Sequence, residues 1–310
     1  MKTNLIRQAI SAAALAFLGC SAQLVQAGTV TVITSFPKEL TQIYKTAFEK
    51  ANPDIKIEIL NKNTVQGMAY VRELPIGQRP EVFWASAPDA FEVMSGLKLL
   101  EPIGELANKS APAKVGSYPI NAPNNMYLGQ ALAGYGLMLN TRYMSANKLP
   151  APKQWVDLIK PEYFGHVAMS SPSRSGTTHL TVETLLQGEG WEKGWRQLLQ
   201  ISGNCAAITE RSFGVPDGVN NGQFGIGLVI DFFGLAGKFS GFPVDFVYPD
   251  VTAVVPASIA LVSGSKNAVE ARKFISYTVS QQGQELLYNP KISRLPILPP
   301  EAMGGKTPAG

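Results

Sequence analysis

The strongest constraint on the fold lies near the start of the chain, where a helical segment separates two strand-like segments. Residues 29–34 are Thr-Val-Thr-Val-Ile-Thr and residues 55–60 are Ile-Lys-Ile-Glu-Ile-Leu, so both have the alternation that predicts β-strands. Between them, apolar side chains recur over residues 40–51 at the spacing of an amphipathic helix, and the pattern stops before Pro53. This order predicts two parallel strands joined by a right-handed crossover. We therefore expect an α/β fold.

The strand-loop-helix order recurs farther along the chain. Segments 81–84 and 167–170 each read as a strand that runs into a loop of small residues and then a helix, and a further helix is expected at residues 155–159. Longer apolar segments at 130–140 and 252–262 are expected to be central strands. In open α/β sheets, ligands bind at loops that leave the C-terminal ends of strands. With 310 residues, the chain is long enough for two domains.

Residues 1–27 have the features of a secretory signal peptide. Lys2 and Arg7 precede a short apolar stretch at residues 9–18, and residues 25–27 end in the small-residue pattern of a cleavage site. The alternative, an N-terminal membrane anchor, needs about 20 apolar residues, which is more than this stretch contains. We therefore expect export to the periplasm.

The two cysteines bear on processing and on redox chemistry. Lipid attachment at Cys20 is an alternative to simple cleavage, but bulky Leu18 stands where lipoprotein processing requires a small residue. Cleavage after residue 27 leaves Cys205 as the only cysteine, so no internal disulfide can form. We expect Cys205, which two alanines follow, to be a buried apolar side chain rather than a nucleophile.

The charge balance excludes several classes of partner. Charged residues make up only 16% of the chain, and removal of residues 1–27 lowers the formal net charge from +4 to +2. No basic segment that would bind nucleic acid or an anionic membrane remains. The partner is therefore expected to be a small molecule or another protein.

The segment richest in candidate binding residues follows the strand at 167–170. Residues 171–178 read Ser-Pro-Ser-Arg-Ser-Gly-Thr-Thr and lead into a helix. The first N–H groups of a helix lack backbone partners and carry partial positive charge, so hydroxyls, a glycine and a planar arginine fork here suit an anion. The alternative is that a hydroxyl merely caps the helix. The candidate ligand-binding residues are Ser173, Arg174, Ser175, Gly176, Thr177 and Thr178.

Four candidates lie outside this segment. Ser35 and Phe36 follow the first strand, and Ser86 follows the strand at 81–84, so three strand-to-helix turns can converge on one cleft. Each serine alone would only cap a helix, and a core position is the alternative for Phe36. Asp231 lies in an apolar run, where a carboxylate has to be paired, and the alternative is that it only caps or turns the chain.

No enzyme motif is present in the sequence. The nucleophile elbow, the zinc-protease helix, the P-loop and the complete dinucleotide fingerprint are all absent. The two histidines, His166 and His179, have no recognisable nucleophile beside them. We expect a binding protein with no catalytic residue, no metal site and no cofactor. A periplasmic hydrolase is the alternative, and it would need a nucleophile or a metal constellation.

Seven segments, in order along the chain, resemble the type II periplasmic solute-binding proteins of ABC importers. The cluster they resemble includes binders of ferric iron, phosphosugars, phosphonates and other organophosphates. The resemblance covers almost the whole chain after residue 27, and its most specific part is the last segment. The segments are Ser35, 82–86, 132–140, 171–178, 188–191, 222–227 and 268–283.

The resemblance implies a monomer of two α/β lobes, with the ligand held between them and delivered to an ABC permease. We expect lobe 1 to comprise residues 28–130 plus 253–310 and lobe 2 to comprise residues 131–252, joined by crossing strands. It also implies that the candidate residues above contact the ligand.

The resemblance bears on the ligand as well. Members that bind ferric iron have two adjacent tyrosines roughly where this chain has Phe232 and Phe233, and phenylalanine offers no ligand atom. This departure, together with the Arg174 loop, favours a small anionic, phosphorylated organic solute. Two alternatives stay open, namely ferric iron as the ligand and a role as the ligand-binding partner of a sensor kinase.

Overall fold

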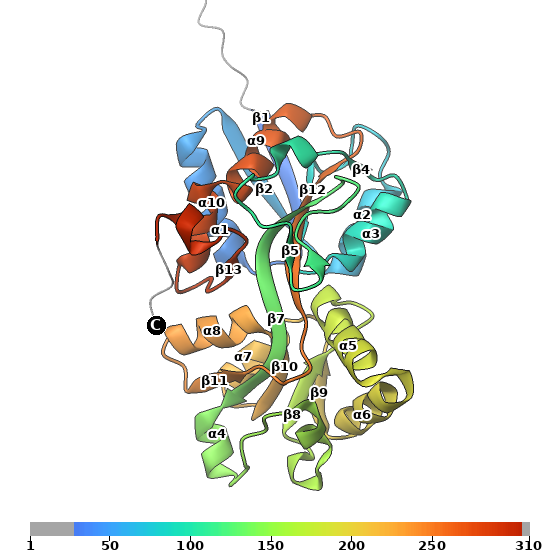
Figure 1. Cartoon of the computed structure of the whole chain (residues 1–310), viewed down its shortest axis with the longest axis vertical. Helices are drawn as coiled ribbons and strands as arrows, with labels where there is room; N and C mark the ends of the chain where they lie inside the picture. Colours follow the sequence, from blue (N-terminus) through green and yellow to red (C-terminus); the bar gives the residue numbers. More distant parts are fainter. Residues whose placement is uncertain (1–27, 306–310) are drawn as a thin grey trace, which may run out of the picture.

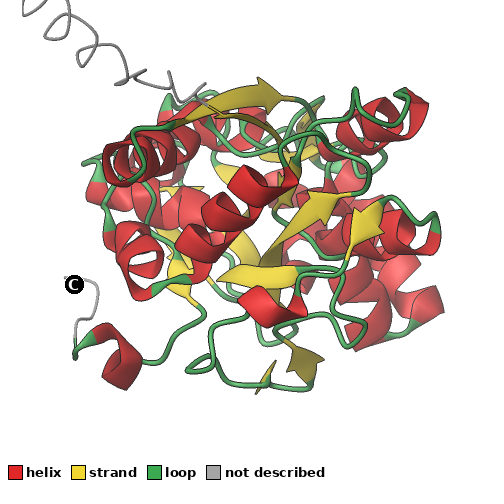
Figure 2. Cartoon of the chain, turned by 90° about the horizontal axis from the view of Figure 1, so that it is seen from above, coloured by secondary structure: helices red, strands yellow, loops and turns green. Residues whose placement is uncertain are grey.

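A computed structural model describes residues 28–305, and the expected signal peptide, Cys20 included, lies outside the described residues. Two α/β lobes are stacked along the long axis of the molecule, and β7 (Leu128–Asn140) runs from one into the other (Figure 1). Seen from above, helices lie on both sides of the central strands (Figure 2). Within residues 28–305, no helix is both long and apolar enough to cross a membrane.

Lobe 1, the upper lobe in Figure 1, contains the expected strand-helix-strand unit. β1 (Gly28–Thr34) and β2 (Ile55–Asn61) are parallel neighbours, and α1 (Lys38–Ala51) connects them. The apolar face of α1 packs into the core of this lobe through Tyr44 and Phe48. The other elements are α2 (Thr64–Glu73), β3 (Val82–Ala85), α3 (Asp89–Gly96), β4 (Leu100–Glu101), η1 (Gly104–Leu106), β5 (Lys114–Val115), β6 (Tyr118–Pro119), β12 (Val254–Val262), α9 (Ala268–Val279), α10 (Gln281–Glu285), η4 (Leu286–Tyr288), β13 (Leu295–Pro296) and η5 (Pro300–Met303).

Lobe 2 is built on β8 (Val167–Ser170), which lies between β9 (Cys205–Thr209) and β10 (Ile226–Ile230), both parallel to it. The helix expected at residues 155–159 is a short 3-10 helix, which ends at Ile159 because Lys160 precedes Pro161 and is extended. Cys205 is half-buried rather than buried, and its thiol is free. The other elements are α4 (Thr141–Ala146), η2 (Trp155–Ile159), η3 (Pro161–Tyr163), α5 (Gly176–Glu189), α6 (Trp191–Gly203), α7 (Gly214–Asn220), α8 (Asp231–Phe239) and β11 (Val244–Val247).

The strand β7 is the main connection between the lobes. Its first half pairs with β12 in lobe 1 up to Gly134, and its second half pairs with β10 in lobe 2 from Tyr135 onward. A Cβ at Gly134 would lie 2.7 Å from the ring of Tyr248, so a larger residue at this change of partner would displace that ring. One continuous order, β2-β1-β3-β12-β7-β10-β8-β9, results. The lobe boundaries at residues 130 and 252 stay a prediction.

Candidate functional site

Side-chain hydroxyls from both lobes meet at the interlobe boundary. Ser86, after β3, and Thr177, in the first turn of α5, are both buried, and their hydroxyl oxygens lie 2.9 Å apart. The cavity around them measures about 10 Å³, which is room for about one water molecule, so the lobes are closed on each other. We call Ser35, Ser86, Ser175 and Thr177 the hydroxyl cluster. The residues that line the cavity are Ser35, Asn63, Thr64, Ser86, Arg174, Ser175, Thr177, Arg211 and Ser212.

The start of α5 is shaped for close approach to lobe 1. Ser175 is the N-cap, and its hydroxyl accepts a hydrogen bond of 3.2 Å from the N–H of Thr178. A Cβ at Gly176 would lie 3.3 Å from Ala87 and Thr64 of lobe 1, so glycine lets the two lobes touch here. The N–H groups of Gly176 and Thr177 lie in the first turn and have no partner within the helix.

The Arg174 loop lies partly outside the cavity. The Arg174 guanidinium is more than half exposed and donates to Glu210 through Nη1 at 2.6 Å. The hydroxyl of Ser173 is exposed and bonded to Ser171, whereas that of Thr178 is buried and bonded to Ser170. Neither Ser173 nor Thr178 lines the cavity. In the closed molecule, Arg174 therefore lies at the rim of the site.

A buried arginine that sequence reasoning missed lies at the same boundary. Arg294 is only 2% exposed, and its Cζ lies 4.4 Å from the ring centres of Phe36 in lobe 1 and of Phe232 in lobe 2. None of the described residues accepts a hydrogen bond from its Nε, Nη1 or Nη2. Burial lowers the pKa of Arg294 to about 10, so the group is charged at neutral pH. One signal could have found it, namely a single charge in the apolar segment 292–298.

Asp231, the first residue of α8, is satisfied within the protein. It is 2% exposed, and its Oδ2 accepts hydrogen bonds from the N–H of Gly134 at 2.7 Å and from the hydroxyl of Tyr248 at 2.9 Å. Its Oδ1 accepts from the N–H of Phe232 at 2.7 Å. Burial raises the pKa of Asp231 to about 6, although these hydrogen bonds act in the opposite direction. In the closed state Asp231 fixes the chain where β7 changes lobe.

Two further polar contacts cross the boundary. Arg211 of lobe 2 donates to Asn61 of lobe 1 through Nη2. His179 on α5 lies 2.6 Å, Nδ1 to Oδ2, from Asp89 on α3, and this hydrogen bond raises the pKa of His179. Within residues 28–305, no group of three or more His, Cys, Asp or Glu side chains is positioned to hold a metal ion.

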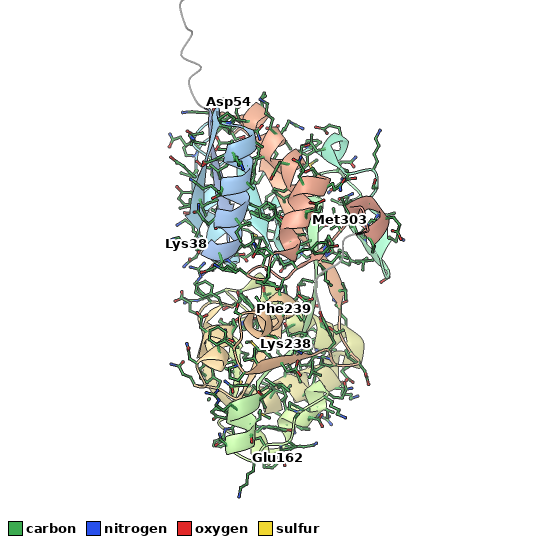
Figure 3. All side chains as sticks on the ribbon, turned by 90° about the vertical axis from the view of Figure 1, so that its left-hand side faces the viewer. Lys38, Asp54, Glu162, Lys238, Phe239 and Met303 are labelled. Atoms are coloured by element: carbon green, nitrogen blue, oxygen red, sulfur yellow. The ribbon has the colours of Figure 1, made fainter. Side chains whose placement is uncertain are left out.

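A wider groove runs along the boundary beside the closed centre. It measures about 780 Å³ and is lined by α1 of lobe 1 and by α7 and α8 of lobe 2, with Lys38, Phe232 and Phe233 among its residues. Figure 3 shows Lys38 at the end of α1 that faces lobe 2, and Asp54 at the opposite end of lobe 1. Because Phe232 lines the groove and also contacts Arg294, the groove leads toward the buried guanidinium.

Comparison with known proteins bears on the family and on the fold. The family model described as bacterial extracellular solute-binding protein matches residues 79–302. The phosphoglycerate transport regulatory protein PgtC of Salmonella typhimurium is 40% identical over 191 residues, which cover 61% of this chain and 48% of the relative. The chain thus spans about half the length of that relative. The major ferric iron-binding protein of Neisseria gonorrhoeae is 25% identical over 296 residues, which cover 93% of this chain and 84% of the relative.

Solved structures resemble this one over most of its length. The periplasmic binding protein AfuA from Actinobacillus pleuropneumoniae, with fructose-6-phosphate bound, aligns with a TM-score of 0.80 at 18% identity. The alignment covers 90% of this chain and 86% of that one. The expected two-lobed type II fold is therefore confirmed. The family match over residues 79–302 shows that the chain belongs to the bacterial extracellular solute-binding proteins.

Proposed function

We propose that this protein is the periplasmic solute-binding component of an ABC importer, which holds a small phosphorylated organic anion between its lobes and delivers it to the permease. The observation that carries the proposal is the hydroxyl cluster, closed across the boundary by the contact between Ser86 and Thr177. The start of α5 adds unpaired N–H groups and partial positive charge, which suit a phosphate. When the lobes open, Arg174 and Arg211 at the rim are available to the same anion.

The relatives support a phosphate ester. The solved structure of AfuA names fructose-6-phosphate as its ligand, and the name of PgtC refers to phosphoglycerate. The two compounds share a phosphate monoester on a small polar carbon skeleton. A site built of uncharged hydroxyls and helix N–H groups binds such a phosphate without a metal ion.

Ferric iron fits the boundary less well. Where iron-binding members have tyrosines, this chain has Phe232, whose ring lies 4.4 Å from the guanidinium of Arg294. A ferric ion bound beside this position would be near that guanidinium, and two positive charges close together in a buried site repel each other. The buried Arg294 therefore favours an anion over a trivalent cation.

A second candidate function is solute sensing, in which the protein with its solute bound acts on a receptor instead of a permease. PgtC, which is 40% identical over 191 residues, is named as a transport regulatory protein. This similarity supports sensing as an alternative to transport. The same cleft would then present the solute to a receptor kinase. Uptake of radiolabelled solute by cells that express the importer constitutively separates the roles, because loss of this protein stops uptake only if it feeds the permease.

Binding is tested by a thermal-shift and calorimetric panel on the protein beginning at Gly28. The panel contains fructose 6-phosphate, 3-phosphoglycerate, glycerol 3-phosphate, inorganic phosphate and ferric citrate. At about 100 times its dissociation constant, a true ligand adds about 2.7 kcal/mol to the unfolding free energy. We expect at least one phosphate ester to do so. A protein that turns coloured with ferric citrate and responds to no phosphate ester contradicts the proposal.

A further inference from the structure

Arg294 has donors for an acceptor that the protein itself does not supply. Its guanidinium carries five N–H donors in a rigid plane, and no oxygen of residues 28–305 accepts from them. The rings of Phe36 and Phe232 attract the charge, but a ring face accepts only weak hydrogen bonds. Asp231, whose charge acts on Arg294, has both oxygens bonded to Gly134, Phe232 and Tyr248.

The position of Arg294 is fixed by the fold. It immediately precedes β13, which pairs with β7 through Leu295 and Leu132. Phe36 belongs to lobe 1 and Phe232 to lobe 2, so the aromatic surroundings of the guanidinium are complete only when the lobes are closed. A buried charge without a partner is strongly unfavourable. A ligand oxyanion that enters with closure would remove that penalty.

Arg294 and the hydroxyl cluster both lie at the boundary between the lobes. Phe36, which contacts Arg294, directly follows Ser35, which lines the cavity of the cluster. Consecutive Cα atoms are about 3.8 Å apart. A group bound at the cluster and a group bound at Arg294 are thus linked through the adjacent residues Ser35 and Phe36.

We propose that Arg294 binds a carboxylate of the solute through its N–H fork, so that the solute is a phosphorylated carboxylic acid. This inference rests on the proposed function, because it leaves the phosphate at the hydroxyl cluster. A planar carboxylate matches the fork with two parallel hydrogen bonds. A tetrahedral phosphate there would turn its remaining oxygens toward the phenyl rings of Phe36 and Phe232, which offer no polar donor.

The test compares three matched compounds: 3-phosphoglycerate, glycerol 3-phosphate, which lacks the carboxylate, and glycerate, which lacks the phosphate. Dissociation constants are measured by calorimetry for the wild type, Arg294→Met, Arg294→Lys and the control Arg142→Met, an exposed arginine on α4. We expect Arg294→Met to weaken 3-phosphoglycerate binding by about 30-fold or more, and Arg294→Lys to weaken it less. Binding of glycerol 3-phosphate should not weaken in Arg294→Met, since that compound does not engage the fork and the variant removes a buried charge that has no partner.

The outcomes separate this inference from the proposed function. An equal loss for both phosphate esters in Arg294→Met would place the phosphate at Arg294 and overturn the inference, while the proposed function would stand. Equal wild-type affinity for 3-phosphoglycerate and glycerol 3-phosphate would overturn it in the same way. Failure of every phosphate ester to bind the wild type would refute the proposed function itself. If Arg294→Met does not unfold cooperatively, the dissociation constants of the two phosphate esters are compared in Arg294→Lys instead, because this variant keeps the charge.

Discussion

The hydroxyl oxygens of Ser86 and Thr177 lie 2.9 Å apart, although one residue belongs to lobe 1 and the other to lobe 2. Few polar contacts accompany this one across the boundary, chiefly Arg211 with Asn61 and His179 with Asp89. Exposed pairs of this kind contribute little to stability. A ligand that binds both lobes can therefore decide whether the molecule is open or closed.

Removing one hydroxyl from the cluster should weaken phosphate binding. Ser86→Ala and Thr177→Val each delete one donor to a charged ligand group, which corresponds to a loss of about 1.5–3 kcal/mol, or roughly 10- to 150-fold in dissociation constant. Calorimetry with the best phosphate ester of the panel measures the effect, with the exposed Ser145→Ala as control. Unchanged affinity in both variants would move the phosphate away from the hydroxyl cluster.

A methyl group at Gly176 should hinder closure. Its Cβ would lie 3.3 Å from Ala87 and from Thr64 of lobe 1, so the two lobes would have to separate slightly. We expect Gly176→Ala to weaken ligand binding and to reduce the ligand-induced contraction in small-angle X-ray scattering. Gly203→Ala is the control, because a Cβ at Gly203 meets no atom within 4 Å. Contraction as large as in the wild type would show that the helix start does not limit closure.

Much of the fold could be predicted because its strands and helices carry local patterns. The alternation at residues 29–34 and 55–60 and the helical spacing between them predict the parallel pair that β1 and β2 form. Strand-to-helix turns then place Ser35, Ser86 and Thr177 around one cavity. Local patterns predict the approach of Ser35 to Ser86, because the parallel strands β1 and β3 bring their C-terminal ends to one edge of the sheet. The approach of Thr177 depends instead on the packing of lobe 2 against lobe 1.

Arg294 could not be predicted in the same way. Its burial depends on the pairing of Leu295 with Leu132, which lies far away in sequence, and on rings from two lobes. Arg174, by contrast, stands in a loop whose composition favours an anion site, yet it is exposed and paired with Glu210. The composition of a segment shows which charged groups it contains, but tertiary packing decides which of them is buried from solvent.

His179 should make closure depend on pH. Its hydrogen bond to Asp89 raises the pKa of the imidazole in the closed form. A raised pKa stabilises the closed form fully below the ordinary pKa of about 6.5, and the stabilisation is lost as the pH rises through the raised value. We expect the affinity of the wild type divided by that of His179→Gln to fall as the pH rises above about 6.5. Taking this ratio cancels the ionisation of the phosphate itself, and a constant ratio would contradict the prediction.

Asp231 should make the stability of the fold depend on pH with the opposite sign from an ordinary salt-bridged carboxylate. Burial raises its pKa from 3.8 to about 6, so the folded protein holds a proton that the unfolded chain has released between these values. The contribution of Asp231 to the free energy of unfolding is therefore largest below pH 4 and falls by about 3 kcal/mol as the pH rises to about 6. Asn at this position does not titrate. The difference in unfolding free energy between the wild type and Asp231→Asn, measured by urea denaturation, should fall by that amount.

Asp157→Asn provides the matched control for this pH dependence. The hydrogen bond from Lys160 lowers the pKa of Asp157, so this carboxylate stabilises the fold above its ordinary pKa and loses that contribution only as the pH falls below about 4. The difference between the wild type and Asp157→Asn should therefore stay level between pH 4 and pH 6, the range in which the Asp231 difference falls. If the Asp231 difference stays equally level, the buried carboxyl titrates at its ordinary value, and its three hydrogen bonds offset the effect of burial.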